Sequence, residues 1–332
     1  MVEMVEINIP MVNKNNKLAD ISSSIVTVAL ITYHSAKTVT ETLDSIVAQS
    51  HGSQNIELII SDDGSADNTV TVINHWLSQH SHRFYSVTFF ENKTNGGISK
   101  NCNIAWKAAS AEWIKTIAGD DLLHSNCIED NITYVREHPH IELLFSSMIH
   151  FQCDDISNAL AKTPHIKNLS FFNQQAPEQF SFLVKNSFNI APTSFMKRSV
   201  LSSVGFCCEE YRYLEDLPLW LKLTRAGHKL YFMNKETVYY RISNSLSNSV
   251  SRLVNIDFIK QVHLVHKREI WPYLPKFQMW RIYDKKVEYI SWVIPYKLFN
   301  NKRNFFSLSI HYVLSCFRPV AVKKILERFR II

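Results

Sequence analysis

Three pairs of adjacent acidic residues fall where this sequence of 332 residues passes from one predicted element to the next: Asp62-Asp63, Asp120-Asp121 and Glu215-Asp216. Adjacent carboxylates repel each other unless a divalent cation or a shared proton compensates. Magnesium and manganese favour carboxylate, water and phosphate oxygens, so a pair facing a diphosphate is a reasonable metal site. A carboxylate beside a hydroxyl can instead act as a general base. For each pair, the alternative is a solvated turn or a helix cap.

The first two pairs directly follow apolar runs. Ile56–Ile60 reads as a buried parallel strand that leads into Asp62-Asp63, and Trp113–Ile117 reads as a second strand that leads into Asp120-Asp121. Ligands of open α/β sheets bind at the carboxyl ends of the strands. The sequence therefore predicts both pairs at a ligand-binding edge.

The third pair begins a predicted helix that runs to Gly227. Pro218 suits the first turn of this helix, and Gly227 suits its C-terminal stop. Acids at a helix N-terminus gain from the helix dipole, so capping is the alternative to a catalytic role.

A glycine turn, Asn95-Gly96-Gly97, offers a different kind of chemistry. Glycine allows positive φ and close backbone approach, and the N-terminus of the helix from Ile98 is expected to offer unpaired amides to an anion. Lys100 lies in the first turn and could meet a phosphate as a point charge. The alternative is an ordinary loop with a solvated lysine.

Strand and helix signals alternate along the first half of the chain. Such alternation predicts an α/β fold with a mostly parallel sheet and helices on both faces. From His150 to Pro177 the rhythm fades, and this polar stretch is a candidate acceptor-side loop or insertion. The predicted strands are Ile25–Ile31, Ile56–Ser61, Val87–Phe90, Trp113–Ile117 and Ile141–Met148. The predicted helices between them are Thr38–Gln49, a helix capped by Asp67 or Asn68 that runs through Val70, Ile73 and Leu77, Ile98–Ala109 and Cys127–Glu137.

Several short motifs, in this order, resemble those of family 2 glycosyltransferases with the GT-A fold. The resemblance covers approximately residues 24–245. It implies transfer of a sugar from a nucleotide diphosphate donor to an acceptor hydroxyl, usually with inversion and with a divalent metal. The motifs are Thr32-Tyr33, Asp62-Asp63-Gly64-Ser65-x-Asp67-x-Thr69, Asn95-Gly96-Gly97-x-x-x-Asn101, Gly119-Asp120-Asp121 and Glu215-Asp216.

The resemblance also implies roles for individual residues. Asp216 is expected to take the proton from the acceptor hydroxyl, with Glu215 supporting it. Asp120 and Asp121 are expected to hold Mn²⁺ or Mg²⁺, which neutralises charge on the departing nucleoside diphosphate. The residues expected to bind the nucleotide sugar are Thr32, Tyr33, Asp62, Asp63, Gly96, Gly97, Lys100, Asp120 and Arg241.

Three positions depart from the family pattern. Ala118 occupies the first position of the Asp-x-Asp triplet, and Ser243 stands where many relatives have a histidine that approaches the metal or diphosphate. Lys100 replaces a common arginine, which keeps the charge but loses the bidentate fork. Metal dependence is therefore expected with a shell that contains an additional water.

The end of the chain is basic and aromatic. The whole sequence has 36 basic and 30 acidic residues, and residues 297–332 contain eight basic residues against the single acid Glu327. A helix with Val322, Ile325, Leu326 and Phe329 on one face is typical of an interfacial helix on anionic lipid. The alternative is a helix packed on the catalytic domain, and nucleic acid is not expected as a partner.

Three regions are predicted: a polar leader at 1–23, a GT-A nucleotide-sugar-binding and catalytic domain at 24–250, and a helical C-terminal region at 251–332. The sequence shows no export signal and no uninterrupted apolar run of about 20 residues, the length that spans a bilayer. We therefore expect a cytoplasmic protein, peripheral at the inner face of the cell membrane.

The predicted function is that of a glycosyltransferase in surface polysaccharide biosynthesis, such as O-antigen or capsule, with a lipid-linked or growing glycan as acceptor. One alternative is a sugar nucleotidyltransferase, which would be expected to carry a Gly-rich, arginine-containing loop after the first strand, where this chain has Thr32-Tyr33-His34-Ser35. The other is a non-catalytic carbohydrate- or lipid-binding relative, against which Asp120, Asp121 and Asp216 argue.

Overall fold

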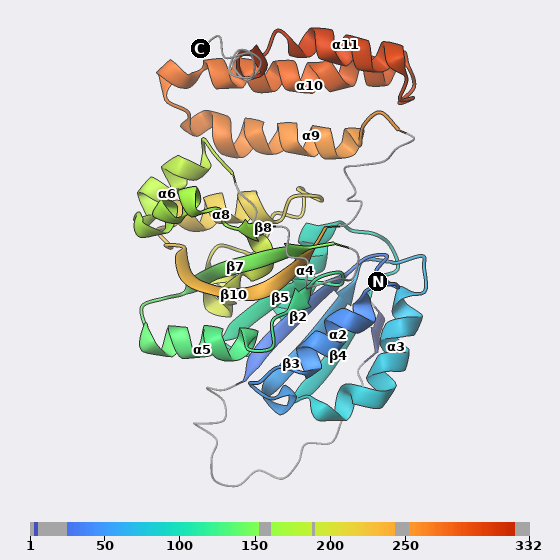
Figure 1. The fold of residues 1–332 in the computed structure, drawn as a ribbon, viewed down its shortest axis with the longest axis vertical. Coiled ribbons are helices and arrows are strands. Elements are labelled where there is room, and N and C mark those ends of the chain that lie inside the picture. The colour runs from blue at the N-terminus through green and yellow to red at the C-terminus, as the bar shows by residue number, and fades with distance from the viewer. Residues whose placement is uncertain (1–2, 6–24, 153–160, 188–189, 243–251, 323–332) are drawn as a thin grey trace. The chain divides into compact units, whose positions relative to one another are not determined.

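The computed structural model describes residues 3–5, 25–152, 161–187, 190–242 and 252–322 (Figure 1). The chain divides into two compact units, residues 1–242 and residues 243–332. The first unit is built on a ten-stranded sheet, and the described part of the second unit is predominantly helical.

The centre of the sheet consists of parallel strands in the order β4-β3-β2-β5. Their side chains are largely buried because the strands are covered on both faces, which is why they read as continuous apolar runs. Within the leader, β1 (Glu3–Val5) pairs antiparallel with β4 at the edge. The central strands are β2 (Val26–Thr32), β3 (Ile56–Asp62), β4 (Ser86–Glu91) and β5 (Trp113–Ala118).

The other half of the sheet is mixed. Strand β9 (Phe195–Lys197) is antiparallel to β5 and β7 (Leu143–Phe151), and β10 (Tyr231–Arg241) is parallel to β7. The short strand β6 (Leu122–Leu123) pairs antiparallel with β10, and β8 (Ala161–Thr163) pairs with β7. The pairing of β6 with β10 brings the end of β10 beside the loop that follows β5.

Helices cover both faces of the sheet, as the alternating sequence pattern predicts (Figure 1). Helices α2 (Val39–Val47), α3 (Thr69–His80) and α5 (Cys127–Glu137) share one apolar core with alternate side chains of the central strands. Helix α4 (Ile98–Ala108) contacts β2 and β3. At the start of α3, Oδ1 of Asp67 accepts a hydrogen bond from the Thr69 amide at 3.1 Å. The fold class predicted from the sequence is confirmed.

The stretch from His150 to Pro177, which was expected to be irregular, contains more structure than the sequence indicated. The 3₁₀ segment η3 (Ile166–Asn173) buries Phe171 and Phe172, and α6 begins at Ala176 and ends at Leu183. The Phe172 ring stacks on Phe232 of β10 with 4.9 Å between centroids. These aromatic side chains gain enough burial to order a segment that is otherwise polar.

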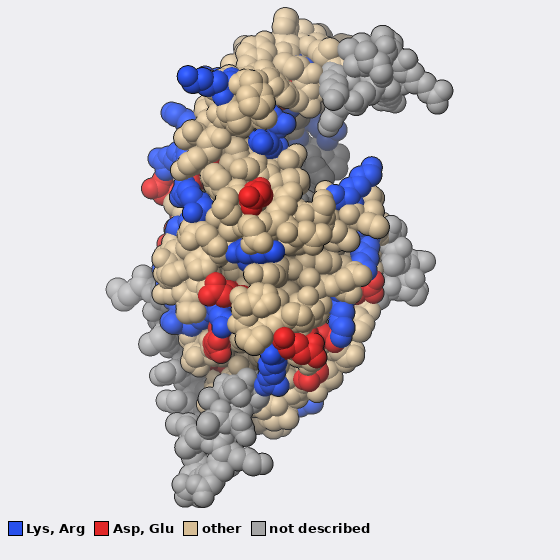
Figure 2. Space-filling view, turned by 90° about the vertical axis from the view of Figure 1, so that its left-hand side faces the viewer, with Lys and Arg blue, Asp and Glu red and all other residues tan. Residues whose placement is uncertain are grey.

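Two more helices complete the first unit, α7 (Arg198–Ser203) and α8 (Asp216–Arg225). On the face drawn in Figure 2, Lys and Arg side chains lie interspersed with Asp and Glu among the described residues. This mixture is the ordinary pattern of a solvated surface. The remaining short segments are η1 (Ser53–Asn55), η2 (Ser81–Arg83), η4 (Ala191–Thr193), the π-helical η5 (His266–Ile270), η6 (Trp271–Tyr273) and η7 (Lys276–Gln278).

The second unit contains α9 (Ile256–Val265), α10 (Trp280–Leu298) and α11 (Phe305–Ser315). Helix α10 packs against both α9 and α11. Over the described part of the chain, no helix combines the length and the apolar character that crossing a bilayer requires. The apolar face predicted from Val322 to Phe329 lies, beyond Val322, outside the described residues.

Candidate active site

Asp62 closes the turn that follows β3. Its Oδ1 accepts hydrogen bonds from Thr32 Oγ1 at 2.8 Å and from Ser65 Oγ at 2.7 Å, and its Oδ2 accepts from the Ser65 amide at 2.8 Å. The side chain is buried. This carboxylate therefore fixes the ends of β2 and β3 relative to each other, whereas the sequence placed it among the donor-binding residues.

Asp63 holds the glycine turn. Its two carboxylate oxygens accept hydrogen bonds from the amides of Gly96, at 2.7 Å, and Gly97, at 2.9 Å. Burial raises the pKa of Asp63, and these two amides oppose the rise. The Ile98 amide donates to Arg212 O at 2.8 Å. The amides of Gly96, Gly97 and Ile98 are therefore paired within the protein.

Gly97 is required by close backbone approach. Its φ is +92°, and a Cβ atom at this position would lie 2.4 Å from the carbonyl oxygen of Arg212. The Arg212 side chain in turn donates to Asn95 O at 2.8 Å. The turn is thus packed against the segment that precedes α8, a contact that no local sequence signal indicated.

The end of β2 leads to an aromatic pair. The Tyr33 ring stacks on His34 with 4.1 Å between centroids, and Tyr33 is exposed. His34 has a φ of +52°, and its amide donates to Ser65 Oγ at 2.8 Å, which holds the pair beside the Asp62 turn. Lys100 is exposed on α4, and its stem lies against Gly96.

The side chain of Asn101 joins the ends of β2 and β3. Its Nδ2 donates to Ser61 O at 2.9 Å and to Thr32 O at 3.2 Å, and its Oδ1 accepts from Ser61 Oγ at 2.5 Å. The side chain is buried and binds backbone carbonyls at the ends of both β2 and β3.

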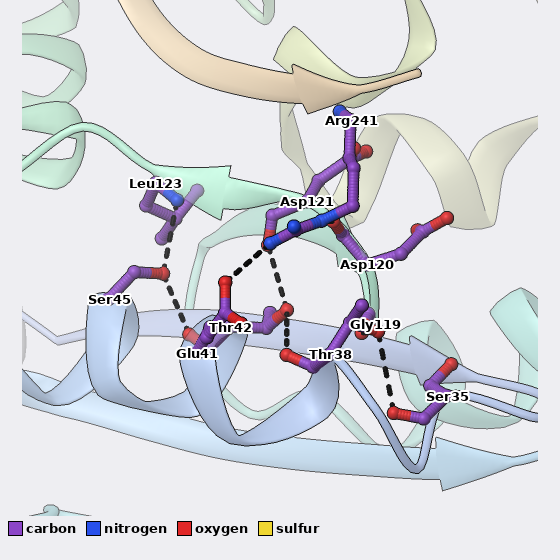
Figure 3. A network of polar contacts seen from close by, with 10 residues as sticks. All are labelled: Ser35, Thr38, Glu41, Thr42, Ser45, Gly119, Asp120, Asp121, Leu123 and Arg241. Atoms are coloured by element: carbon purple, nitrogen blue, oxygen red, sulfur yellow. Dashed lines mark hydrogen bonds and ion pairs between the residues drawn. The ribbon is translucent and has the colours of Figure 1, made fainter. Parts of the chain in front are cut away.

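One face of α2 holds the acidic loop after β5 (Figure 3). Thr38 Oγ1 donates to Gly119 O at 2.7 Å, Thr42 Oγ1 donates to Asp121 O at 2.8 Å, and the Leu123 amide donates to Ser45 Oγ at 3.1 Å. Residues spaced by four and then three positions lie on the same side of a helix. These three hydroxyls therefore fix the backbone on both sides of Asp120.

Arg241, at the end of β10, binds the same loop from the other side. Its amide donates to Asp121 Oδ1 at 2.9 Å, and its Nε donates to Asp120 O at 2.9 Å. Its Nη2 pairs with Glu41 of α2 at 2.5 Å. Arg241 is buried and is engaged with protein groups in this structure. Glu41 was not identified from the sequence, because it lies 200 residues from its partner.

Asp120 and Asp121 are electrostatically strained as a pair. Burial raises the pKa of Asp120, and it raises the pKa of Asp121 further, with the charge of Asp120 adding to the effect. Arg241 opposes both shifts. Figure 3 shows the Asp120 carboxylate pointing away from the α2 side chains. A divalent cation beside this carboxylate would relieve the repulsion, so the pair fits such an ion.

A buried lysine lies behind the acidic pair. Lys115 Nζ donates to carbonyl oxygens of Thr116, Pro192 and Ser194, and burial lowers its pKa to about 8. Within the described ranges, no cluster of three or more His, Cys, Asp or Glu is arranged to hold a metal ion. A metal here would therefore take its other ligands from water and phosphate oxygens. Ser243, where the family pattern has histidine, lies outside the described residues.

Glu215 and Asp216 are set at the start of α8. Asp216 Oδ1 accepts a hydrogen bond from the Leu217 amide at 2.6 Å. Burial, with the charge of Asp216 adding, raises the pKa of Glu215 to about 8, and burial also raises the pKa of Asp216. Two neighbouring carboxylates in such a site share a proton at neutral pH.

The three acidic pairs act on common neighbours. The charges of Asp121, Asp120 and Glu215 all add to the effect of burial in raising the pKa of the Tyr240 hydroxyl. Likewise, the charges of Glu215 and Asp63 add to burial in raising the pKa of the Cys102 thiol. Tyr240 therefore lies within electrostatic range of the Asp120-Asp121 pair and Glu215, and Cys102 lies within range of Glu215 and Asp63. Tyr240 is a member of this cluster that sequence reasoning did not single out.

Comparison with known proteins gives a consistent result. The family model described as glycosyl transferase family 2 matches residues 27–205. The chain is 25% identical over 219 residues to the putative glycosyltransferase EpsE of Bacillus subtilis (strain 168), which covers 65% of this chain and 72% of EpsE. It is 22% identical over 237 residues to the poly(ribitol-phosphate) beta-N-acetylglucosaminyltransferase TarS of Staphylococcus aureus (strain Mu50 / ATCC 700699).

The match to that TarS protein covers 70% of this chain but only 38% of TarS. Among solved structures, S. aureus TarS 1–349 in complex with UDP-GlcNAc superposes with a TM-score of 0.54 at 21% identity, over 80% of this chain and 72% of that chain. This structural likeness establishes the shared fold.

Proposed function

Because this chain belongs to glycosyl transferase family 2 and is a glycosyltransferase with a GT-A-like fold, we propose that it transfers a sugar, with inversion, from a nucleoside diphosphate donor to an acceptor hydroxyl during assembly of a bacterial cell-surface polymer. The observation that carries the proposal is the position of two acidic pairs at the carboxyl ends of the parallel strands β3 and β5, together with Glu215 at the start of α8, whose charge acts on Tyr240 and Cys102 as the charges of these pairs do. Ligands of such sheets bind at this edge.

Asp216 is the proposed general base. The Glu215-Asp216 pair shares a proton at neutral pH, so one of its carboxylates is ionised and can accept the proton of the acceptor hydroxyl, a role that we assign to Asp216. The Leu217 amide holds one of its oxygens, which orients the carboxylate. General-base catalysis of this kind contributes about a hundredfold to ten-thousandfold.

Asp120 and Asp121 are the proposed ligands of a divalent metal, Mn²⁺ or Mg²⁺. When bound, such an ion neutralises charge that develops on the departing nucleoside diphosphate. The α2 hydroxyls and Arg241 hold the backbone around both acids and the carboxylate of Asp121, so the acidic loop need not reorder when donor binds.

The donor is proposed to lie across the ends of β2, β3 and α4. Exposed Tyr33 and Lys100 provide a ring face and a cation, and Asp63 with its glycine turn forms the wall between them. Structures of S. aureus TarS 1–349 in complex with UDP and with UDP-GlcNAc support a nucleotide sugar as donor. Asp62 and Arg241 support this site from within through their bonds to Thr32 and to the Asp120 backbone.

The acceptor is proposed to be a lipid-linked or growing glycan on the cytoplasmic side of the membrane. The names of relatives support an acceptor of this general kind. One of these relatives is the minor teichoic acid biosynthesis protein GgaB of Bacillus subtilis (strain 168), which matches 30% of this chain. The basic and aromatic residues of the second unit support a peripheral contact with the membrane.

A panel of nucleotide sugars tests the proposal. Purified protein is incubated with each donor and Mn²⁺, and nucleoside diphosphate is measured with and without a lipid-linked acceptor. We expect release from one donor, faster with acceptor, and its loss on chelation of the metal. Release of inorganic pyrophosphate from a sugar phosphate and a nucleoside triphosphate would instead identify a nucleotidyltransferase, and the absence of any release would contradict the proposal.

A further inference from the structure

Helix α11 is polar on its buried side and apolar on its exposed side. Ser307 and His311, spaced by four residues, are buried against α10, where the His311 ring stacks on Trp292 with 3.6 Å between centroids. The opposite side carries large apolar residues that are 62–78% exposed, namely Phe305, Phe306, Tyr312 and Val313, and the exposed Phe317 follows the end of the helix. A helix stabilised only by its own unit would bury these residues and expose the polar ones.

Helix α10 repeats the arrangement. Asp284 and Ser291 are buried, and Asp284 pairs with Arg318 at 3.1 Å. The exposed stripe consists of Tyr283, Ile290, Ile294 and Leu298. Lys286 and Lys297 are also exposed and lie next to this stripe on the helix surface. The acids Asp284 and Glu288 lie on a different face of the helix, where both pair with Arg318.

Charge indicates which partner covers these apolar faces. Residues 252–322 contain twelve Lys and Arg against four Asp and Glu. No charged residue interrupts the sequence from Phe305 to Phe317, while Lys302 and Arg303 are exposed just before it. A second copy of the chain would bring two strongly basic units together, which is unfavourable. An anionic lipid surface instead attracts the cations and accepts the aromatic side chains.

We propose that the outward face of α11, together with Lys302 and Arg303, docks the protein on an anionic lipid bilayer. The eleven residues of α11 span about 16 Å, about half the thickness of the hydrocarbon core, so the helix lies along the surface. The inference deepens the proposed function, on which it rests for the membrane location of the acceptor. It assigns the contact to α11 and its N-terminal turn.

Vesicle flotation of the full chain tests this assignment. Vesicles are made of phosphatidylcholine with or without phosphatidylglycerol. We expect the wild-type protein to float with the anionic vesicles only, and to be released by salt. Phe305→Ser/Phe306→Ser is expected to weaken vesicle binding by about tenfold or more, and Lys302→Gln/Arg303→Gln to weaken it at low salt.

Ile166→Ser is the matched control, because Ile166 is 75% exposed in the first unit and is expected to keep wild-type vesicle binding when replaced. Undiminished binding of Phe305→Ser/Phe306→Ser would overturn the proposal. A wild-type protein that does not bind vesicles would also overturn it. This includes a protein that forms a dimer instead, if Phe305→Ser/Phe306→Ser dissociates that dimer.

Donor hydrolysis without vesicles, measured on the same preparations, separates the two proposals. All variants are expected to hydrolyse donor like the wild type, since none of the replaced residues belongs to the site. A wild-type protein that binds anionic vesicles through α11 but turns over no donor would contradict the proposed function and leave the membrane assignment standing.

Discussion

The Arg241 amide donates a hydrogen bond of 2.9 Å to Oδ1 of Asp121, which joins the end of β10 to the loop that follows β5. One carboxylate of the acidic pair is thereby committed to a backbone group, while the Asp120 carboxylate points away from the supporting side chains. The two acids therefore differ in their surroundings although they are adjacent in sequence. Asp120 is the member better placed to meet a ligand.

Replacement of Asp120 by Asn should weaken activation by metal more than it affects folding. The substitution removes the charge at the outward-pointing position, so we expect the Mn²⁺ concentration needed for half-maximal donor hydrolysis to rise by at least about tenfold. Manganese titrations of nucleoside diphosphate release measure this. Asp130→Asn, which removes an acid paired with Lys235 on the surface, is the control. Identical titration curves for Asp120→Asn and wild type would exclude Asp120 as a ligand.

Replacement of Asp216 by Asn should separate donor binding from transfer. We expect unchanged affinity for nucleoside diphosphate by calorimetry and a rate of transfer about a hundredfold to ten-thousandfold lower, because the base is lost while its shape remains. Glu178→Gln, which removes an exposed acid from the first turn of α6, should transfer at the wild-type rate. Unchanged turnover of Asp216→Asn would remove the base assignment.

Glu215 should make stability depend on pH. Since burial and the charge of Asp216 raise its pKa from 4.5 to about 8, the folded protein binds more protons than the unfolded chain between these values. The free energy of unfolding contributed by this group therefore falls as pH rises through that window. The Gln side chain of Glu215→Gln cannot ionise. We therefore expect the melting temperature of this variant to rise relative to that of the wild type as pH increases from about 5 to about 9. Parallel melting profiles for the two proteins would show that Glu215 is not the titrating group.

Alanine at Gly97 should be more damaging than alanine at Gly227. Both glycines have φ near +90°, which L residues rarely adopt, so both substitutions strain the backbone by about 1–3 kcal/mol. A Cβ atom at Gly97 also meets the Arg212 carbonyl, whereas nothing lies within 4 Å at Gly227. We expect Gly97→Ala to lose roughly a further 1–3 kcal/mol in urea unfolding and to bind nucleoside diphosphate more weakly. Equal losses for the two variants would mean that the turn relaxes away from Arg212.

Valine at Thr42 should loosen the acidic loop. The substitution keeps the shape of the buried side chain but leaves Asp121 O without its donor, at a cost of about 1–3 kcal/mol. Thr40→Val, at an exposed position of the same helix, should change stability by less than about 0.5 kcal/mol. Urea unfolding of both variants provides the comparison, and indistinguishable midpoints would argue against the α2 contact.

Much of the sheet could be predicted because the relevant signals are local. Continuous apolar runs located β2, β3 and β5 to within a residue or two, and the helix of Cys127–Glu137 has the predicted bounds. The acidic pairs at strand ends followed from the same runs. Their roles in binding and catalysis remain predictions.

The remaining features depend on contacts between residues far apart in sequence. The pairing of Glu41 with Arg241 and the approach of Arg212 to Gly97 have no local signature. Asp63 was read as a ligand-facing acid, but its two oxygens bind amides 33 and 34 residues away. In the second unit, the apolar residues of α11 were visible in the sequence, but periodicity alone does not indicate which side of a helix is buried.

The hydroxyl groups of α2 determine whether the repulsion between Asp120 and Asp121 arises when the chain folds or when a ligand binds. Because Thr38, Thr42 and Ser45 hold the main chain around Asp120 and Asp121, the repulsion between these acids is already present when the chain folds. The carboxylates are therefore already in place when the donor and a cation bind, and the cation reduces the repulsion between them. The loop that carries Asp120 and Asp121 thus costs folding stability in order to be preorganised for cation binding. Helix α2 is the element that holds it in this arrangement.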